Sequence, residues 1–366
     1  MAAAIEGPSH RDVCSESGRF LEPRQSDGHT YKILTKTPLF GSFGQVFQAK
    51  DEAGKEVAIK VATRIDELAQ NSFAREARFH EACKTDDVPL RVPLLDSGTV
   101  DLETGIRAPF FVFKWAGPDL LERIQDRTLS LREAQGLVFA LLPHLVVMHE
   151  LKWVHGDVKL ENFTLSDDGS LGAIDLQAFR ADEEGAVRGT IPYSDPCVAL
   201  GLPASPEEDV WALGHLFYNL AMHCPIFYLR EDCHFEQLIP SDHIFVLHQI
   251  AQMMGPELVP EEALEHTRHR ELVHTVEGRI ALEPISAFLL PMRYDEAMEK
   301  KFCDDPLKES SIDLLRSMFA PRGRRSSARA LMAQIDVNTA IIERPLGSET
   351  DGSSSESPSA AGAPSP

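Results

Sequence analysis

The pattern of apolar residues changes once along the 366-residue chain, near Trp115–Asp119. From Tyr31 to Phe113 short apolar runs separated by turn residues predict strands, with one amphipathic helix at Asp66–Cys83. After Trp115–Asp119 helical spacing predominates, interrupted by one strand-like stretch, Phe163–Ile174. We therefore expect an α+β protein with a small strand-rich lobe followed by a larger helical lobe. The helices expected in the larger lobe are Leu131–Leu151, Glu207–Met222, Ile244–Met254, Ile312–Phe319 and Ala328–Ile335.

Both ends of the chain are polar and lack apolar periodicity. Such segments cannot bury enough apolar surface to offset the entropy of ordering. We therefore expect a flexible N-terminal segment at residues 1–28 and a disordered tail rich in Ser, Pro and Gly at residues 337–366. Between them we expect a folded domain over residues 29–336, divided into a strand lobe, a hinge and a helical lobe at 29–113, 114–119 and 120–336.

Composition and charge exclude several classes of protein. The net charge of −21 argues against a nucleic-acid binder, which needs a basic face. The longest apolar run, Leu137 to Val147, is shorter than the roughly 20 residues that a membrane span needs, so no membrane segment is expected. The 6 cysteines show no CxxC pairing, which is typical of reduced thiols in the cytoplasm, with the nucleus as an alternative.

One lysine, Lys60, stands in the otherwise apolar stretch Val57-Ala58-Ile59-Lys60. A lysine that faces a core is rare unless an anion is paired with it. Glu76, on the helix expected next, is the best-placed partner, and Glu81 is the alternative.

The stretch from Leu39 to Val46 carries two glycines, Gly41 and Gly44. Glycines allow a strand–turn–strand backbone to lie close to phosphate groups and to direct N–H groups at them. An ordinary hairpin turn would give the same pattern.

The segment Val154–Asn162 reads VHGDVKLEN and holds three chemically useful side chains. Asp157 can accept or orient a hydroxyl proton, Lys159 can neutralise a phosphate, and Asn162 offers an oxygen to a metal ion. Asp175 follows 13 residues after Asn162 and ends a short apolar stretch, where it could hold the main metal ion. Satisfied turn residues remain the alternative for each site.

In this order and spacing the chain resembles the eukaryotic protein kinases over about residues 31 to 336. The resemblance implies the two-lobed protein kinase fold, with ATP and Mg²⁺ as cofactors and a protein hydroxyl as acceptor. The catalytic residues that it implies are Lys60, Glu76, Asp157 and Lys159, and the metal ligands are Asn162 and Asp175. The nucleotide-binding residues that it implies are Leu39, Gly41, Ser42, Phe43, Gly44, Val46, Ala58, Lys60, Phe113, Lys114, Ala116 and Thr164.

Two further segments extend the resemblance. Thr190 would contact Asp157 and Lys159, a pairing typical of serine/threonine kinases, and Asp209 would brace the catalytic loop. Some motifs look like casein kinase one and vaccinia-related kinases, and others are similar to SR-protein kinases and their CMGC relatives. The sequence leaves the choice between these subfamilies open.

Several positions depart from the family pattern. Gly156 replaces an arginine that normally pairs with a phosphorylated residue, and 176–189 contains no Ser, Thr or Tyr. We therefore expect activity without phosphorylation of this segment. Gln177 stands where a glycine is usual. Cys197 replaces a glutamate that would pair with an arginine such as Arg324, so weaker anchoring of the substrate platform is expected.

Three functional classes stay open: an active protein serine/threonine kinase, a pseudokinase scaffold, and a small-molecule kinase of the aminoglycoside or choline type. Lys159 and the segment from Asp209 to Gly214 count against the small-molecule class. Glu161 matches the position at which kinases of basic substrates pair a substrate arginine, so a basic protein substrate is a hypothesis. We expect no nucleic-acid or membrane partner, and the oligomeric state is open.

Overall fold

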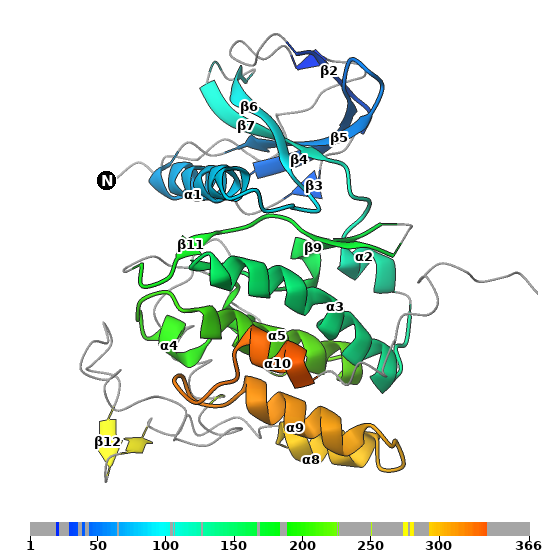
Figure 1. The fold of residues 1–366 in the computed structure, drawn as a ribbon, viewed down its shortest axis with the longest axis vertical. Helices are drawn as coiled ribbons and strands as arrows, with labels where there is room; N and C mark the ends of the chain where they lie inside the picture. The colour runs from blue at the N-terminus through cyan, green and yellow to red at the C-terminus, as the bar shows by residue number, and fades with distance from the viewer. Residues whose placement is uncertain are drawn as a thin grey trace, which may run out of the picture.

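The computed structural model has two lobes (Figure 1). The upper lobe contains a sheet and one long helix, and the lower lobe is mainly helical. The α+β, two-lobed architecture expected from the sequence is confirmed. The residues that the structure describes are 20–21, 29–35, 39–40, 44–63, 66–102, 105, 107–125, 127–166, 169–183, 189–224, 226, 250, 274–276, 279–281 and 293–334.

The upper lobe is an antiparallel sheet in the order β1-β2-β4-β5-β7-β6, with β3 paired to β4. The turn expected at Asp51–Gly54 is present and joins β4 to β5. The strands are β1 (Phe20–Leu21), β2 (Tyr31–Ile33), β3 (Leu39–Phe40), β4 (Gly44–Lys50), β5 (Glu56–Ala62), β6 (Leu94–Asp101) and β7 (Arg107–Lys114).

Two details of this lobe go beyond the sequence prediction. The segment expected to be an unstructured lead-in contains β1, which pairs with β2. Gly44 is required by packing rather than by an unusual backbone angle, because a Cβ at this position would lie 2.6 Å from the carbonyl oxygen of Val61. The glycine therefore allows β4 to approach β5 closely.

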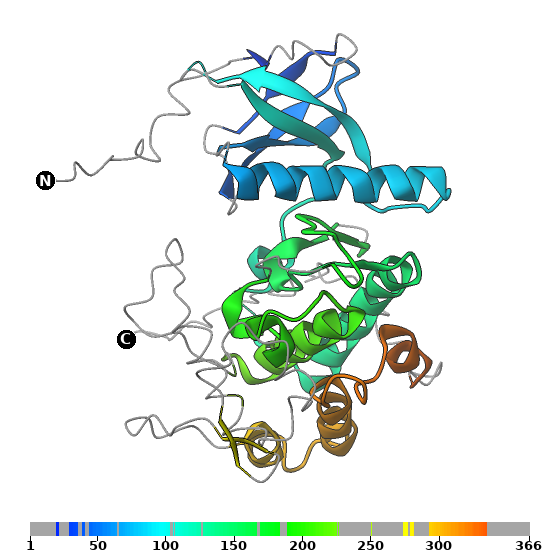
Figure 2. The ribbon, with the colours of Figure 1, turned by 90° about the vertical axis from the view of Figure 1, so that its left-hand side faces the viewer.

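Helix α1 (Glu67–Thr85) lies along the underside of the sheet, facing the lower lobe (Figure 2). Its N-cap is Asp66, whose carboxylate accepts the N–H of Ala69 and so satisfies one of the free donors at the helix start. The buried residues Ala69, Phe73 and Glu76 recur every three or four positions, which is the spacing of one helix face. Glu76 is thus turned toward the sheet by helical periodicity.

The lower lobe is built on α3 (Leu131–Glu150) and α5 (Pro206–Met222), which pack against each other. Both helices begin with a complete capping box, at Ser130 and Ser205. The remaining helices of the described lobe are α2 (Leu120–Ile124), α4 (Pro196–Ala199), α8 (Tyr294–Lys301), α9 (Lys308–Met318) and α10 (Ala328–Gln334), with 3₁₀ turns at Leu160–Asn162 and Ile191–Tyr193.

Helix α3 is the one helix among the described residues that is long and apolar enough to cross a membrane by length and composition. In its most apolar stretch 61% of the residues are buried inside the molecule. Its apolar surface packs against α5, α9 and α10 in the core of the lower lobe.

The strand-like stretch expected at Phe163–Ile174 is two short antiparallel strands rather than one, β9 (Phe163–Leu165) and β10 (Leu171–Ala173). Two further pairs are β8 (Trp153–Val154) with β11 (Phe179–Arg180) and β12 (His274–Val276) with β13 (Arg279–Ala281). The helix expected at Ile244–Met254 lies outside the described residues except for 250.

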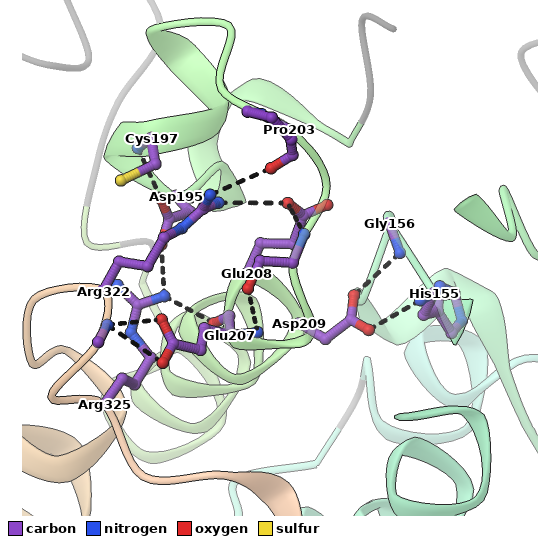
Figure 3. Close-up of polar contacts among 12 residues, drawn as sticks. His155, Gly156, Asp195, Cys197, Pro203, Glu207, Glu208, Asp209, Arg322 and Arg325 are labelled. Atoms are coloured by element: carbon purple, nitrogen blue, oxygen red, sulfur yellow. Dashed lines mark hydrogen bonds and ion pairs between the residues drawn. The ribbon is translucent and has the colours of Figure 1, made fainter. Parts of the chain in front are cut away.

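A buried ion pair anchors the start of α4 and corrects one prediction. Asp195, not Cys197, supplies the carboxylate, and its partner is Arg325 rather than Arg324 (Figure 3). Arg325 also donates to the carbonyl oxygen of Glu207, at 2.6 Å. The expectation of weak anchoring is therefore wrong, because a carboxylate two positions earlier reaches the arginine.

The charged neighbours of Asp195 set its protonation. Burial by itself would raise the pKa of Asp195, but Arg325 and Arg322 outweigh burial and lower the pKa from 3.8 to about 2. Asp195 is thus ionised across the whole physiological range.

Replacing Asp195 with asparagine would leave the buried guanidinium of Arg325 without its counter-ion. We expect Asp195→Asn to lower the free energy of unfolding by about 3 kcal/mol at neutral pH, measured by urea unfolding. Because the folded-state pKa is depressed, the stabilisation is complete above pH about 4 and is lost as the pH falls through about 2. The difference between wild type and variant should shrink over that interval.

The matched control is Asp313→Asn. Asp313 is 71% exposed and pairs with Arg316 on the surface of α9, so its loss should change stability by about 0.5 kcal/mol or less. Equal effects of the two substitutions would contradict the anchoring role of Asp195.

Candidate active site

The ammonium group of Lys60 joins three separate elements below the sheet. Its Nζ lies 2.7 Å from Glu76 Oε2 on α1 and also forms an ion pair with Asp175, which follows β10. Lys60 is 6% exposed and Glu76 is 1% exposed, so this pair is almost fully removed from water. The partner predicted for Lys60 is confirmed, and Glu81 is not needed.

The ammonium of Lys60 and its two carboxylate partners shift one another's pKa values. Burial alone would lower the pKa of Lys60, but the carboxylates of Asp175 and Glu76 raise it above its ordinary value. Partial desolvation would raise the pKa of Asp175, whose side chain is 40% exposed, yet the ammonium of Lys60 lowers it. For Glu76 burial outweighs the ammonium, and the pKa is raised. Lys60 and Asp175 are therefore both charged at neutral pH.

A cavity of 380 Å³ opens beside this ion cluster, between the two lobes. Ala58 and Lys60 are two residues apart on β5, so they point to the same face of the sheet and both line the cavity. A cavity of this size suits a small organic ligand. Of the residues predicted to bind nucleotide, those that line it are Leu39, Gly44, Val46, Ala58, Lys60, Phe113, Lys114, Ala116 and Thr164.

Thr164 lines the cavity. Its hydroxyl donates to the carbonyl oxygen of Gly172 at 3.3 Å, which satisfies the polar atom inside the protein. Three other predicted nucleotide-binding residues, Gly41, Ser42 and Phe43, lie outside the described residues.

The cavity has lining residues that the sequence reasoning missed. His80 lies one turn after Glu76 on α1, and Val92 and Asp119 also line the cavity. His80 is 7% exposed, and burial lowers its pKa to about 4, so its ring is neutral at physiological pH. The helical spacing of four residues from Glu76 was a signal that could have identified His80.

The loop after β8 brings together the side chains predicted for proton and phosphate handling. Asp157 Oδ1 accepts a hydrogen bond from the hydroxyl of Thr190 (2.7 Å), and Oδ2 accepts one from Asn162 Nδ2 (2.9 Å). Lys159 Nζ lies 3.1 Å from Asp157 Oδ2 and donates to Thr190 Oγ1 at 3.0 Å. The predicted contact of Thr190 with both residues is confirmed.

The same loop is held from below by α5. Asp209 accepts the backbone N–H of His155 at 2.7 Å and that of Gly156 at 2.9 Å (Figure 3). Asp209 Oδ2 also lies 2.9 Å from His149 Nε2 on α3. The bracing role expected of Asp209 is confirmed, and it fixes the backbone one residue before Asp157.

The donor set beside the cavity fits a magnesium ion. Asn162 and Asp175 both line the cavity and both carry oxygen donors, which Mg²⁺ prefers. The amide nitrogen of Asn162 donates to Asp157 Oδ2 and to the Asp157 carbonyl oxygen, so the amide orientation is fixed with its oxygen left for a ligand. Asp175 has 40% of its side chain exposed while one oxygen binds Lys60.

Comparison with known proteins agrees with this arrangement. The family model described as the protein kinase domain matches residues 40–334. A probable serine/threonine-protein kinase of Corynebacterium efficiens is 32% identical over 200 residues, 51% of this chain and 30% of that protein. Serine/threonine-protein kinase PknA of Mycobacterium tuberculosis is 28% identical over 195 residues, 49% of this chain and 44% of that protein.

The aligned stretch spans less than half the length of each of these relatives. The two subfamily interpretations are not separated by these matches and stay predictions. The family model, in contrast, covers both lobes, from β3 to the end of α10. This chain therefore belongs to the protein kinase family.

Proposed function

We propose that this chain is a protein serine/threonine kinase, which transfers the γ-phosphoryl group of ATP to a protein hydroxyl. The observation that carries the proposal is the convergence of Lys60, Lys159, Asn162 and Asp175 on one cavity. Phosphoryl transfer needs mainly positioning and charge neutralisation, and these side chains offer both. The similar proteins whose names are serine/threonine-protein kinases support the choice of acceptor.

The residues around the cavity have different proposed roles in binding ATP, Mg²⁺ and the acceptor hydroxyl. Val46 and Ala58 offer an apolar surface for the adenine, and Lys60, held by Glu76, can bind phosphate oxygens. Asn162 and Asp175 would hold Mg²⁺, which would neutralise phosphate charge when bound. Asp157 is placed to orient the acceptor hydroxyl and accept its proton.

Thr190 and Lys159 complete the acceptor side. The hydroxyl of Thr190 donates to Asp157 and accepts from Lys159, so it holds both side chains in place beside their direct ion pair. This arrangement suits a serine or threonine hydroxyl presented next to Thr190.

The free thiols of Cys83, Cys197, Cys224 and Cys303 are consistent with the proposed cytoplasmic location.

Asp157→Asn removes the proton acceptor without changing the size of the side chain. We expect the rate of ATP-dependent phosphorylation of a protein acceptor to fall by about a hundredfold or more, with nucleotide binding retained. Radiolabel transfer and nucleotide-binding calorimetry measure the two properties, and Asp313→Asn is the control. Transfer to a metabolite panel but not to proteins, or no turnover by wild type despite nucleotide binding, would overturn the proposal.

We also propose that activity does not require phosphorylation between residues 176 and 189, since that stretch has no Ser, Thr or Tyr. Protein made in bacteria and treated with phosphatase should keep the turnover number of untreated protein. Loss of activity on treatment, restored by a second kinase, would refute this independence.

A basic substrate is the finer proposal. Glu161 is exposed and lies at the cavity, where its carboxylate could pair with a substrate arginine. We expect Glu161→Gln to lower kcat/KM for an arginine-containing peptide about tenfold relative to an alanine-substituted peptide, because a charge-assisted hydrogen bond is lost. Glu122→Gln, an exposed change on α2, is the control, and a peptide array that favours acidic residues would count against the idea.

A further inference from the structure

The backbone after Asp175 packs against the catalytic loop through a site that only glycine permits. Gly156 has a φ of +78°, and a Cβ built on it would lie 2.7 Å from Phe179 Cδ2. The ring of Phe179 is fully buried in this space, and its strand β11 pairs with β8, which leads into the loop. The ring of Phe179 thus occupies the space that a side chain at position 156 would need.

Helix α1 reaches the same ring through Arg75. The guanidinium carbon of Arg75 lies 4.2 Å from the centroid of the Phe179 ring, a cation–π arrangement. Arg75 Nε donates to the carbonyl oxygen of Gln177 at 3.1 Å. Arg75 is the residue directly before Glu76, so the same helical turn contacts both Lys60 and the segment after Asp175.

Gln177 extends the connection toward the acceptor side. Its side-chain oxygen accepts the N–H of Gly189 at 3.2 Å, and Gly189 is followed by Thr190, which binds Asp157. Gln177 is not among the described residues with positive φ, so the glycine usual at this position is not needed for the backbone. The contacts therefore run without a break from α1 to the residue that orients Asp157.

We infer that Arg75 is a positioning residue: by stacking on Phe179 and bonding to Gln177 it fixes α1 against the segment 177–179 in the arrangement that keeps Glu76 on Lys60. Planar guanidinium groups can stack on a ring and donate in plane at once, which a lysine cannot match fully. The contacts of Arg75 with Phe179 and Gln177 need no phosphorylated residue. The expected effect on turnover rests on the proposed kinase function. The contacts of Arg75 with Phe179 and Gln177, here called the latch, do not depend on that function.

The test compares Arg75→Met with Arg78→Met in the 366-residue chain. Methionine keeps an unbranched apolar stem but has no guanidinium, and Arg78 is an exposed residue on the same helix. Hydrogen exchange is measured for peptides that contain the Ala178 and Ala181 amides, which bond to His155 and Lys152. Steady-state kinetics give kcat and KM for ATP.

We expect Arg75→Met to speed exchange at these amides and to lower kcat about tenfold, with a smaller change in KM, while Arg78→Met leaves both as in wild type. Arg75→Lys, which keeps a cation and a donor, should recover part of both effects. Partial rescue would separate positioning from a general loss of stability, which unfolding measurements check on the same proteins.

Each outcome decides one of the two proposals. Wild-type exchange in Arg75→Met overturns the latch, whatever the kinetics. Faster exchange in Arg75→Met together with no phosphoryl transfer by wild type supports the latch and refutes the proposed kinase function. Faster exchange with unchanged kcat shows that Arg75 is structural only and overturns its positioning role.

Discussion

The buried ammonium of Lys60 is the interaction on which the rest of the structure depends. It lies on β5, its first partner Glu76 lies on α1, and its second partner Asp175 comes from the lower lobe. Leaving one of these charges buried without a partner would be strongly unfavourable, because desolvation would no longer be offset. The position of α1 under the sheet and the position of Asp175 below it are therefore coupled through one nitrogen atom.

The lower lobe holds the loop that carries Asp157 by the same physical means. Asp209 is 1% exposed, and its carboxylate is satisfied by the backbone amides of His155 and Gly156. Asp195 is equally buried and is satisfied by Arg325 and by the amide of Cys197, at 2.6 Å. Each carboxylate thus joins a loop to a helix, and the loops that carry Asp157 and Thr190 are fixed to the core around α3 and α5.

Much of the fold and of the site was predictable from local sequence. The change of apolar period near Trp115–Asp119 separated the lobes, and the lone lysine in an apolar strand required an acidic partner. Helical spacing then selected Glu76 over Glu81, since Glu76 falls on the buried stripe of α1. These inferences succeed because they depend on periodicity and on the free energy of burying a charge, both of which are local properties.

Other features depended on which distant residues meet. The sequence predicted that loss of a carboxylate at position 197 would weaken anchoring, but folding places Asp195 against Arg325, 130 residues away. Adjacent residues on a turn point in different directions, so no local pattern could choose Arg325 over Arg324. Likewise, the sequence by itself determined that position 156 is a glycine, and only the tertiary structure decided that the ring of Phe179 occupies the space beside it and that Arg75 stacks on that ring, because packing joins segments that chain order keeps apart.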